Sequence, residues 1–174
     1  MSFCETHLNI VLVEPEIPQN TGNVARTCAA VGADLHLIEP LGFSIEDRYL
    51  KRAGLDYWDK LKVYTYKSFE ELAERYPKGE FRFFTTKGLH SYNEVKYEDG
   101  CFIVFGKETA GLPVELLMSH REHCFRIPMR ESIRSLNLSN SVAIVAFEAM
   151  RQTGFAGFKM TPADEVLMNR LTTI

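Results

Sequence analysis

The chain has 174 residues, a length that fits one globular domain. Hydrophobic residues make up 45% of it and charged residues 25%, which excludes a disordered chain and allows a sizeable core. The formal net charge of −3 argues against nucleic-acid binding driven by overall charge, but it leaves room for a local basic face. We therefore expect one soluble domain over residues 1–174.

Membrane, secretory and metal-binding classes are not favoured. The longest apolar runs, residues 8–13 and 142–147, are far shorter than the roughly 20 residues of a membrane-spanning helix. The first residues lack the features of a signal peptide, so we expect a cytoplasmic protein. The four cysteines form no Cys-x-x-Cys pair, which predicts free thiols. His120, His123 and Cys124 resemble part of a zinc site, but no second cluster completes four ligands, and we predict no metal.

Strand and helix signals alternate along the chain. The run 8–13 is β-branched and ends before a proline, which predicts a buried strand. Residues 20–23 are typical helix caps and precede a predicted helix over 24–31, which Gly32 would end. Further strands are predicted over residues 35–38, 62–66, 82–85, 102–105 and 124–127, and helices near 45–53, over 68–75, after Pro113 and over 138–152. This alternation predicts an α/β fold, a mainly parallel sheet with helices on both faces.

Three loops that leave predicted strands carry unusual residues: 14–23, 106–113 and 128–140. Ligands of parallel sheets collect beyond the carboxyl ends of the strands, so we expect these loops to converge on one cleft. Within the loop 106–113, Gly106 and Gly111 stand at the two ends of a turn, where glycine allows positive φ or close approach to a ligand. The alternative is an ordinary turn between a strand and a helix. The usual glycine-rich nucleotide fingerprints are absent.

Polar groups also stand at the start of two predicted helices. Arg26 follows the caps at 20–23, and a helix start with a bidentate arginine donor suits a phosphate. Simple capping beside a surface arginine is the alternative. The polar stretch 134–141 directly precedes the apolar run 142–147, so it lies at the entrance to the core, where it is placed to hold a ligand. Ser139 or Asn140 as a helix cap would explain only part of it.

Together these segments resemble, in order and spacing, the three motifs of the SPOUT methyltransferases. The likeness is strongest to the small single-domain tRNA (cytidine/uridine-34) 2′-O-methyltransferases, and it covers roughly residues 8–157. The segments that carry it are Asn20-Thr21-Gly22-Asn23-Val24-Ala25-Arg26, Phe105-Gly106-Lys107-Glu108-Thr109-Ala110-Gly111-Leu112-Pro113, Ile127-Pro128-Met129, and Arg134-Ser135-Leu136-Asn137-Leu138-Ser139-Asn140.

The resemblance implies a fold and a reaction. It implies a SPOUT type of α/β fold with a C-terminal trefoil knot, a homodimer, and S-adenosyl-L-methionine bound in the knot. The methyl group would pass to the ribose 2′-OH of the wobble nucleotide of tRNA, with S-adenosyl-L-homocysteine as product and no metal required. Carried over position by position, the cofactor contacts fall at Phe84, Gly106, Ile127 and Ser135, with Glu108 and Leu136 close by.

The resemblance also assigns the reacting end of the site. Arg26 and Asn140 are the implied catalytic residues, and Asn20, Asn23, Arg26 and Arg134 the implied contacts to RNA. A guanidinium stays protonated in proteins, so we interpret Arg26 as a phosphate anchor and a polariser of the 2′-OH, not as a free base. Asn140 would orient the ribose.

Two alternatives stay open at this stage. One is a SPOUT ribose methyltransferase that acts on another tRNA position or on ribosomal RNA. The other is an RNA-binding factor of the same fold without catalysis, against which the presence of Arg26, Glu108 and Asn140 counts. Gln19 and residues 130–133 depart from the family pattern, which leaves the choice of tRNA open but not methyl transfer. The sequence does not distinguish cytidine from uridine as the substrate. The tail 158–174 lies outside the resemblance.

Overall fold

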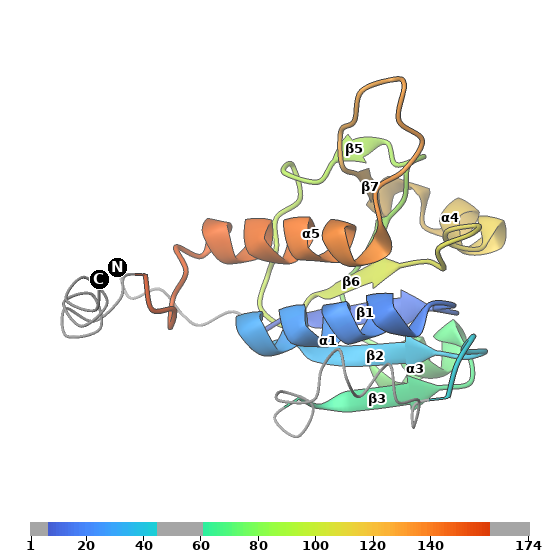
Figure 1. The fold of residues 1–174 in the computed structure, drawn as a ribbon, viewed down its shortest axis with the longest axis horizontal. Helices are drawn as coiled ribbons and strands as arrows, with labels where there is room; N and C mark the ends of the chain where they lie inside the picture. Colours follow the sequence, from blue (N-terminus) through green and yellow to red (C-terminus); the bar gives the residue numbers. More distant parts are fainter. Residues whose placement is uncertain (1–6, 45–60, 161–174) are drawn as a thin grey trace, which may run out of the picture.

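The computed structural model describes residues 7–44 and 61–160. Within these residues the chain forms one seven-stranded sheet in which every pair of neighbouring strands is parallel (Figure 1). The strand order is β3-β2-β1-β6-β4-β7-β5. The strands are β1 (Asn9–Val13), β2 (Asp34–Ile38), β3 (Val63–Tyr66), β4 (Phe81–Phe84), β5 (His90–Ser91), β6 (Phe102–Phe105) and β7 (Cys124–Arg126).

Helices cover both faces of this sheet. On one face α1 (Pro18–Val31) and α5 (Leu138–Gln152) lie side by side, as Figure 1 shows. The other face carries α3 (Phe69–Arg75) and α4 (Val114–Ser119), and a short 3-10 turn over Arg121–His123 precedes β7. The predicted fold class, a parallel α/β sheet between two helical layers, is confirmed.

The central strands are buried on both sides because each face has its own core. In β1, Ile10 and Leu12 pack into the core beneath α1 and α5, whereas Val11 and Val13 pack into the core beneath α3 and α4. Successive strand side chains point to opposite faces, so a continuous apolar run is what a doubly covered strand requires. This is why the run 8–13 predicts its strand to within one residue.

The predicted elements agree with the structure except at a few ends. Helix α1 begins at Pro18, so residues 20–23 are its first turns and the prediction that they cap it is wrong. Helix α5 begins where expected, but its cap is Asn137, which accepts from the Ser139 N–H at 2.9 Å, and not Ser139 or Asn140. The two-residue strand β5 was not predicted. The predicted helix at 45–53 lies outside the described residues.

Candidate functional site

A cavity of about 470 Å³ opens at the carboxyl ends of β4, β6 and β7. All three predicted loops contribute to it, which confirms that they converge on one cleft. Its lining comprises Ile17 and Asn20 from α1 and its approach, Phe84 to Lys87 after β4, Phe105 to Leu112 after β6, Leu117 of α4, and Ile127, Met129, Ser135 to Leu138 and Ser141 from the segment between β7 and α5.

The residues with an implied cofactor role all line this cavity: Phe84, Gly106, Glu108, Ile127, Ser135 and Leu136. Of the residues with an implied role toward RNA, only Asn20 lines it. Asn23 and Arg26 are exposed on α1, Arg134 is exposed on the loop before α5, and Asn140 is exposed in the first turn of α5. The structure thus brings the first group together and places most of the second group outside the cavity wall.

The loop after β6 folds tightly back on itself. The Gly111 N–H donates to the Lys107 carbonyl at 2.9 Å, and Gly111 has a φ of 72°. A Cβ on Gly106 would lie 2.0 Å from the Gly111 carbonyl carbon and 2.1 Å from the Leu112 nitrogen. These distances are too short for any residue with a side chain to replace this glycine. Both glycines are therefore required, one for close approach and one for positive φ.

The start of α1 has no side-chain cap of its own. Glu108, some ninety residues along the chain, instead holds the two residues that precede the helix: its carboxylate accepts from the backbone N–H groups of Glu16 at 2.9 Å and Ile17 at 3.3 Å. The anion that a helix start favours is thus provided by the protein itself. In return, the Glu16 carboxylate accepts from the Thr109 N–H at 3.1 Å and from its hydroxyl.

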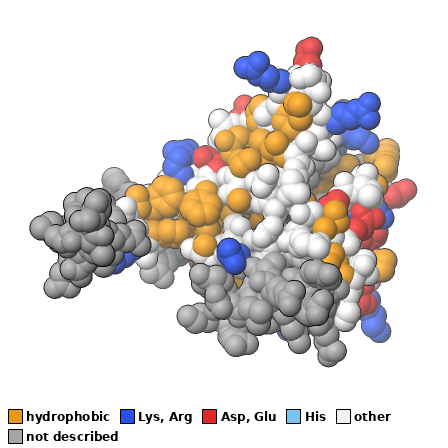
Figure 2. All heavy atoms as spheres, in the orientation of Figure 1, with side chains coloured by type: hydrophobic (Ala, Val, Ile, Leu, Met, Phe, Trp, Pro, Cys, Tyr) orange, Lys and Arg blue, Asp and Glu red, His pale blue; other side chains and the backbone are white. Residues whose placement is uncertain are grey.

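Basic side chains surround the cavity. Lys87 and Lys107 line it, and Arg130 and Arg134 are exposed on the loop between β7 and α5. Figure 2 shows basic side chains on both sides of this protruding loop, with an acidic group at its tip. Lys87 had no role assigned from the sequence, although it follows β4 at its carboxyl end, the position from which ligand contacts are expected.

The described part of the chain, residues 7–44 and 61–160, contains no group of three His, Cys, Asp or Glu side chains arranged for a metal ion. In the partial zinc motif the Cys124 thiol instead donates to the His120 carbonyl at 3.3 Å. Cys28, Cys101 and Cys124 are free and buried, and burial raises the pKa of the Cys101 thiol to about 11. In the same ranges no helix has the length and apolarity to cross a bilayer.

The family to which these features point is identified by comparison with known proteins. The model of the SpoU rRNA methylase family matches residues 7–147, a span that contains the whole sheet and all three loops. The chain belongs to the SpoU rRNA methylase family. The resemblance to RNA ribose methyltransferases that the three motifs indicate is thereby confirmed.

Known proteins resemble the chain over most of its length. A tRNA (cytidine(34)-2′-O)-methyltransferase of Burkholderia cenocepacia is 49% identical over 152 residues, which cover 86% of this chain and 97% of the relative. A structure solved to explain 2′-OH methylation of C/U34 on tRNA is 44% identical, with a TM-score of 0.83 and coverage of 87% and 99%. The AdoMet-bound rRNA methyltransferase from Sinorhizobium meliloti is 25% identical, with a TM-score of 0.74 and coverage of 87% and 59%.

Proposed function

We propose that this chain transfers the methyl group of S-adenosyl-L-methionine to the ribose 2′-OH of nucleotide 34, a cytidine or a uridine, in tRNA. The observation that carries the proposal is the single cavity that collects every residue with an implied cofactor role. Relatives that are 44% and 49% identical over almost their full length, both concerned with position 34 of tRNA, support the choice of substrate.

The cavity suits S-adenosyl-L-methionine in size and chemistry. Its volume lies in the range of small-molecule sites, roughly 300 to 1,000 Å³. Phe84, Ile127 and Leu136 offer apolar surface for an adenine ring, while the tight turn at Gly106 leaves backbone within reach of a ligand. The AdoMet-bound relative from Sinorhizobium meliloti supports this assignment. When bound, the cofactor would supply an electrophilic methyl group; S-adenosyl-L-homocysteine is then the product, and the proton of the 2′-OH passes to water.

The role of the chain's own residues is to bind and orient the nucleotide. Fixed geometry between two reactants is worth effective molarities of roughly 10⁵ to 10⁸ M, so positioning is the main source of rate that we assign to the protein. Arg26, always protonated, anchors a phosphate and polarises the 2′-OH. Arg130 and Arg134, exposed beside the cavity, hold further phosphates, and Ser135 and Asn140 orient the reacting groups.

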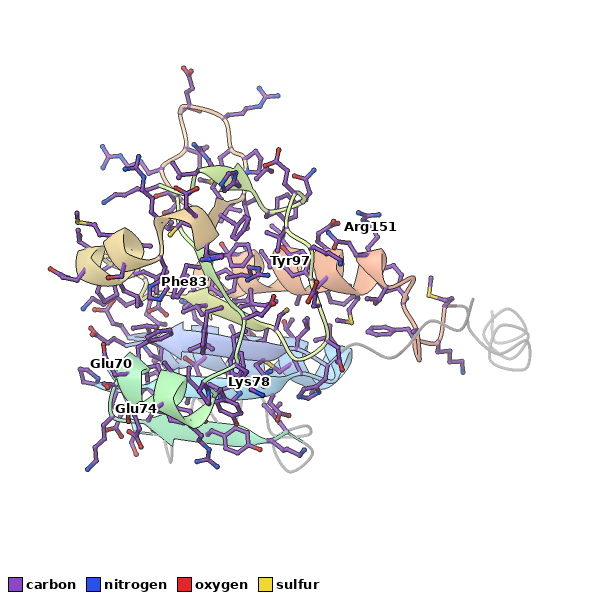
Figure 3. The ribbon with its side chains drawn as sticks, turned by 180° about the vertical axis from the view of Figure 1, so that it is seen from behind. Glu70, Glu74, Lys78, Phe83, Tyr97 and Arg151 are labelled. Atoms are coloured by element: carbon purple, nitrogen blue, oxygen red, sulfur yellow. The ribbon has the colours of Figure 1, made fainter. Side chains whose placement is uncertain are left out.

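We further propose that the chain is knotted around α5. The segment between β5 and β6 crosses the face of the sheet on which α5 lies, because Val95 and Tyr97 belong to the core beneath that helix. The Gln152 amide of α5 donates to the Val95 carbonyl at 2.9 Å and accepts from the Tyr97 N–H at 3.4 Å. Figure 3 shows Tyr97 beside α5. A helix that packs on and hydrogen-bonds to a segment crossing the same face of the sheet supports a threaded C-terminal region.

The outward faces of α1 and α5 are the surface through which we propose that two chains form a homodimer. Ile144 and Phe147 of α5 are 37% and 44% exposed, one turn apart on the helix. Large apolar groups exposed together in this way mark interaction surfaces. Asn140 lies on the same stripe one turn earlier, so a second chain placed there would meet residues with an implied role toward RNA. We place the enzyme in the cytoplasm, with its tRNA substrate.

One experiment tests the proposed reaction directly. The purified protein is incubated with methyl-labelled S-adenosyl-L-methionine and total tRNA, the RNA is digested, and the labelled nucleoside is identified and mapped. We expect 2′-O-methylcytidine or 2′-O-methyluridine at position 34. Label on a base, at another position, or only in added ribosomal RNA would overturn the assignment. Saturable cofactor binding without transfer to any RNA would favour the non-catalytic alternative.

A further inference from the structure

One buried amide connects the three loops of the cavity. Asn20 is 6% exposed, and its Nδ2 donates to the Glu108 carboxylate at 2.9 Å. Its Oδ1 accepts from the Nδ2 of Asn137 at 3.0 Å. The Oδ1 of Asn137 in turn accepts from the Ser139 N–H at 2.9 Å and the Ser139 hydroxyl at 2.7 Å, which caps α5. A continuous line of hydrogen bonds thus runs from the loop after β6, through α1, to the start of α5.

The Glu108 carboxylate determines how the amide groups of Asn20 and Asn137 are oriented. An ionised carboxylate only accepts hydrogen bonds, so the amide nitrogen of Asn20 must face Glu108 and its oxygen must face Asn137. The same reasoning orients Asn137, whose oxygen must then face the backbone N–H of α5. Asn20 therefore has both amide atoms engaged within the chain, which is unsuited to reading RNA and well suited to fixing the relative position of three segments.

We propose that Asn20 is a positioning residue for methyl transfer, one that sets the place of α1, and with it Arg26, relative to the cofactor cavity through Glu108 and Asn137. This inference rests on the proposed function and changes the role of Asn20 within it from a substrate contact to an internal anchor. Arg26 lies six residues further along the same helix, about 9 Å along its axis. Because Asn20 and Arg26 lie on one continuous helix, a shift of its first turn also displaces Arg26.

Three features make this start sensitive to Asn20. Helix α1 has no local side-chain cap, so its first turn is held by contacts from the loop after β6. The carboxylates of Glu16 and Glu108 each bind backbone from the other's segment, and Asn20 is the side chain that extends this pair to α5. Misplacement of a reacting partner by about 1 Å costs about a hundredfold in rate, so small shifts of the helix suffice.

The test separates positioning from substrate contact by kinetics. Asn20→Asp places a second carboxylate against Glu108 without a change of shape. We expect kcat for tRNA methylation to fall at least tenfold, while KM for tRNA stays within twofold of wild type. In the double variant Asn20→Asp with Glu108→Gln, the amide at position 108 can donate to the carboxylate at position 20, the reverse of the wild-type hydrogen bond. We expect this variant to recover at least half of the loss in log kcat. Asn93→Asp, the same change in an exposed turn, is the matched control.

A second variant guards against a folding defect. Asn137→Ser keeps a residue able to cap α5 but is too short to reach Asn20. We expect it to lower kcat at least threefold, with S-adenosyl-L-homocysteine affinity within threefold of wild type by calorimetry. A raised KM for tRNA with unchanged kcat in Asn20→Asp would overturn the inference, and so would a double variant no better than the single ones.

Failure of the proposed reaction is distinguishable from failure of this inference. If the wild-type protein methylates a different RNA, the same kinetic ratios are measured on that RNA. If it methylates none, the inference is tested by the thermal unfolding midpoint with S-adenosyl-L-homocysteine present, in the cycle formed by Asn20→Asp, Glu108→Gln and the double variant. Recovery of the midpoint in the double variant supports direct coupling, and additive losses overturn it.

Discussion

The Lys107 ammonium lies 2.7 Å from the Glu14 carboxylate, so an ion pair joins the loop after β6 to the end of β1. Glu14 has a φ of 51°, a left-handed conformation that a residue with a side chain adopts only where its surroundings hold it. The hydrogen bond and negative charge of Glu14 raise the pKa of the Lys107 ammonium, which is therefore charged at neutral pH. The pair anchors the cavity wall next to Gly106.

Lys107→Met should weaken the binding of S-adenosyl-L-homocysteine about threefold, because the loop loses its ion pair with Glu14. A larger loss is not expected, since a partly exposed ion pair contributes little free energy. The difference from wild type should shrink between low and high salt, since ions screen such a pair. Isothermal titration calorimetry at two salt concentrations measures both effects. Lys78→Met, an exposed lysine away from the cavity lining, is the control (Figure 3). Equal affinities of wild type and Lys107→Met at low salt would refute the anchoring role.

Arg26→Ala should keep cofactor affinity and lose methyl transfer, because Arg26 stands outside the cavity lining and its proposed role is toward the RNA. We expect S-adenosyl-L-homocysteine affinity within twofold of wild type and a fall in kcat of about a hundredfold or more. Arg26→Lys keeps the charge without the bidentate geometry and should fall between the two. Arg75→Ala, on α3 at the opposite face of the sheet, is the control. Unchanged turnover of Arg26→Ala in a tRNA methylation assay would remove Arg26 from the mechanism.

The parts of the site that follow from local sequence were predictable. Each buried strand is recognisable in the sequence as an apolar run. Because the carboxyl ends of parallel strands lie at one edge of the sheet, the loops 14–23, 106–113 and 128–140 are expected to meet there. Gly106 and Gly111 were expected to serve close approach or positive φ, and the structure assigns one to each purpose. The position of the cavity therefore follows from local chemistry and does not depend on the order of the strands.

The parts that depend on distant residues were not predictable from one sequence. Residues 20–23 have the composition of helix caps, and no nearby residue indicates that the helix begins at Pro18, with the residues before it held by Glu108 from the loop after β6. Strand β5 has two residues and exists only because β7 lies beside it. The partnership of Asn20 with Asn137, 117 positions apart, likewise leaves no signal in spacing or composition. These contacts arise from tertiary structure, which local patterns do not encode.

His36 lies fully buried in β2, bonded on both ring nitrogens. Its Nε2 lies 3.0 Å from Asn9 Oδ1, and its Nδ1 lies 3.1 Å from the Tyr66 hydroxyl. The Asn9 oxygen only accepts, and the Tyr66 hydroxyl can donate, so one donor and one acceptor on the ring match the neutral form. Burial lowers the pKa of His36 from 6.5 to about 4, with the charge of Arg75 acting in the same direction and that of Asp34 opposing it.

This lowered pKa predicts a pH-dependent stability. Below pH 6.5 His36 binds a proton in the unfolded chain, whereas in the folded chain it does so only near pH 4. The free energy of unfolding should therefore fall as the pH drops from 6.5 to about 4. The full loss is about 3 kcal/mol. Urea unfolding at pH 7.5 and pH 5 should show a smaller pH effect in His36→Gln than in wild type. His90→Gln, an exposed histidine, should keep the wild-type effect, and an unchanged slope in His36→Gln would contradict the assignment.

Phe147→Glu should convert the protein to single chains if the outward face of α5 forms the dimer contact. Phe147 is 44% exposed beside Ile144, and a carboxylate there would have to lose its water in an apolar contact, at a cost that a pair of helices cannot offset. Sedimentation equilibrium should then give the mass of one chain, 19.9 kDa, where wild type gives twice that value. Met118→Glu is the control: Met118 is 76% exposed on α4, at the other face of the sheet, and its substitution should leave the wild-type mass unchanged.

Because Asn140 lies on the same stripe of α5 as Phe147, the single chains should also methylate tRNA more slowly. A dimeric Phe147→Glu protein, or a monomeric wild type, would exclude this face as the contact.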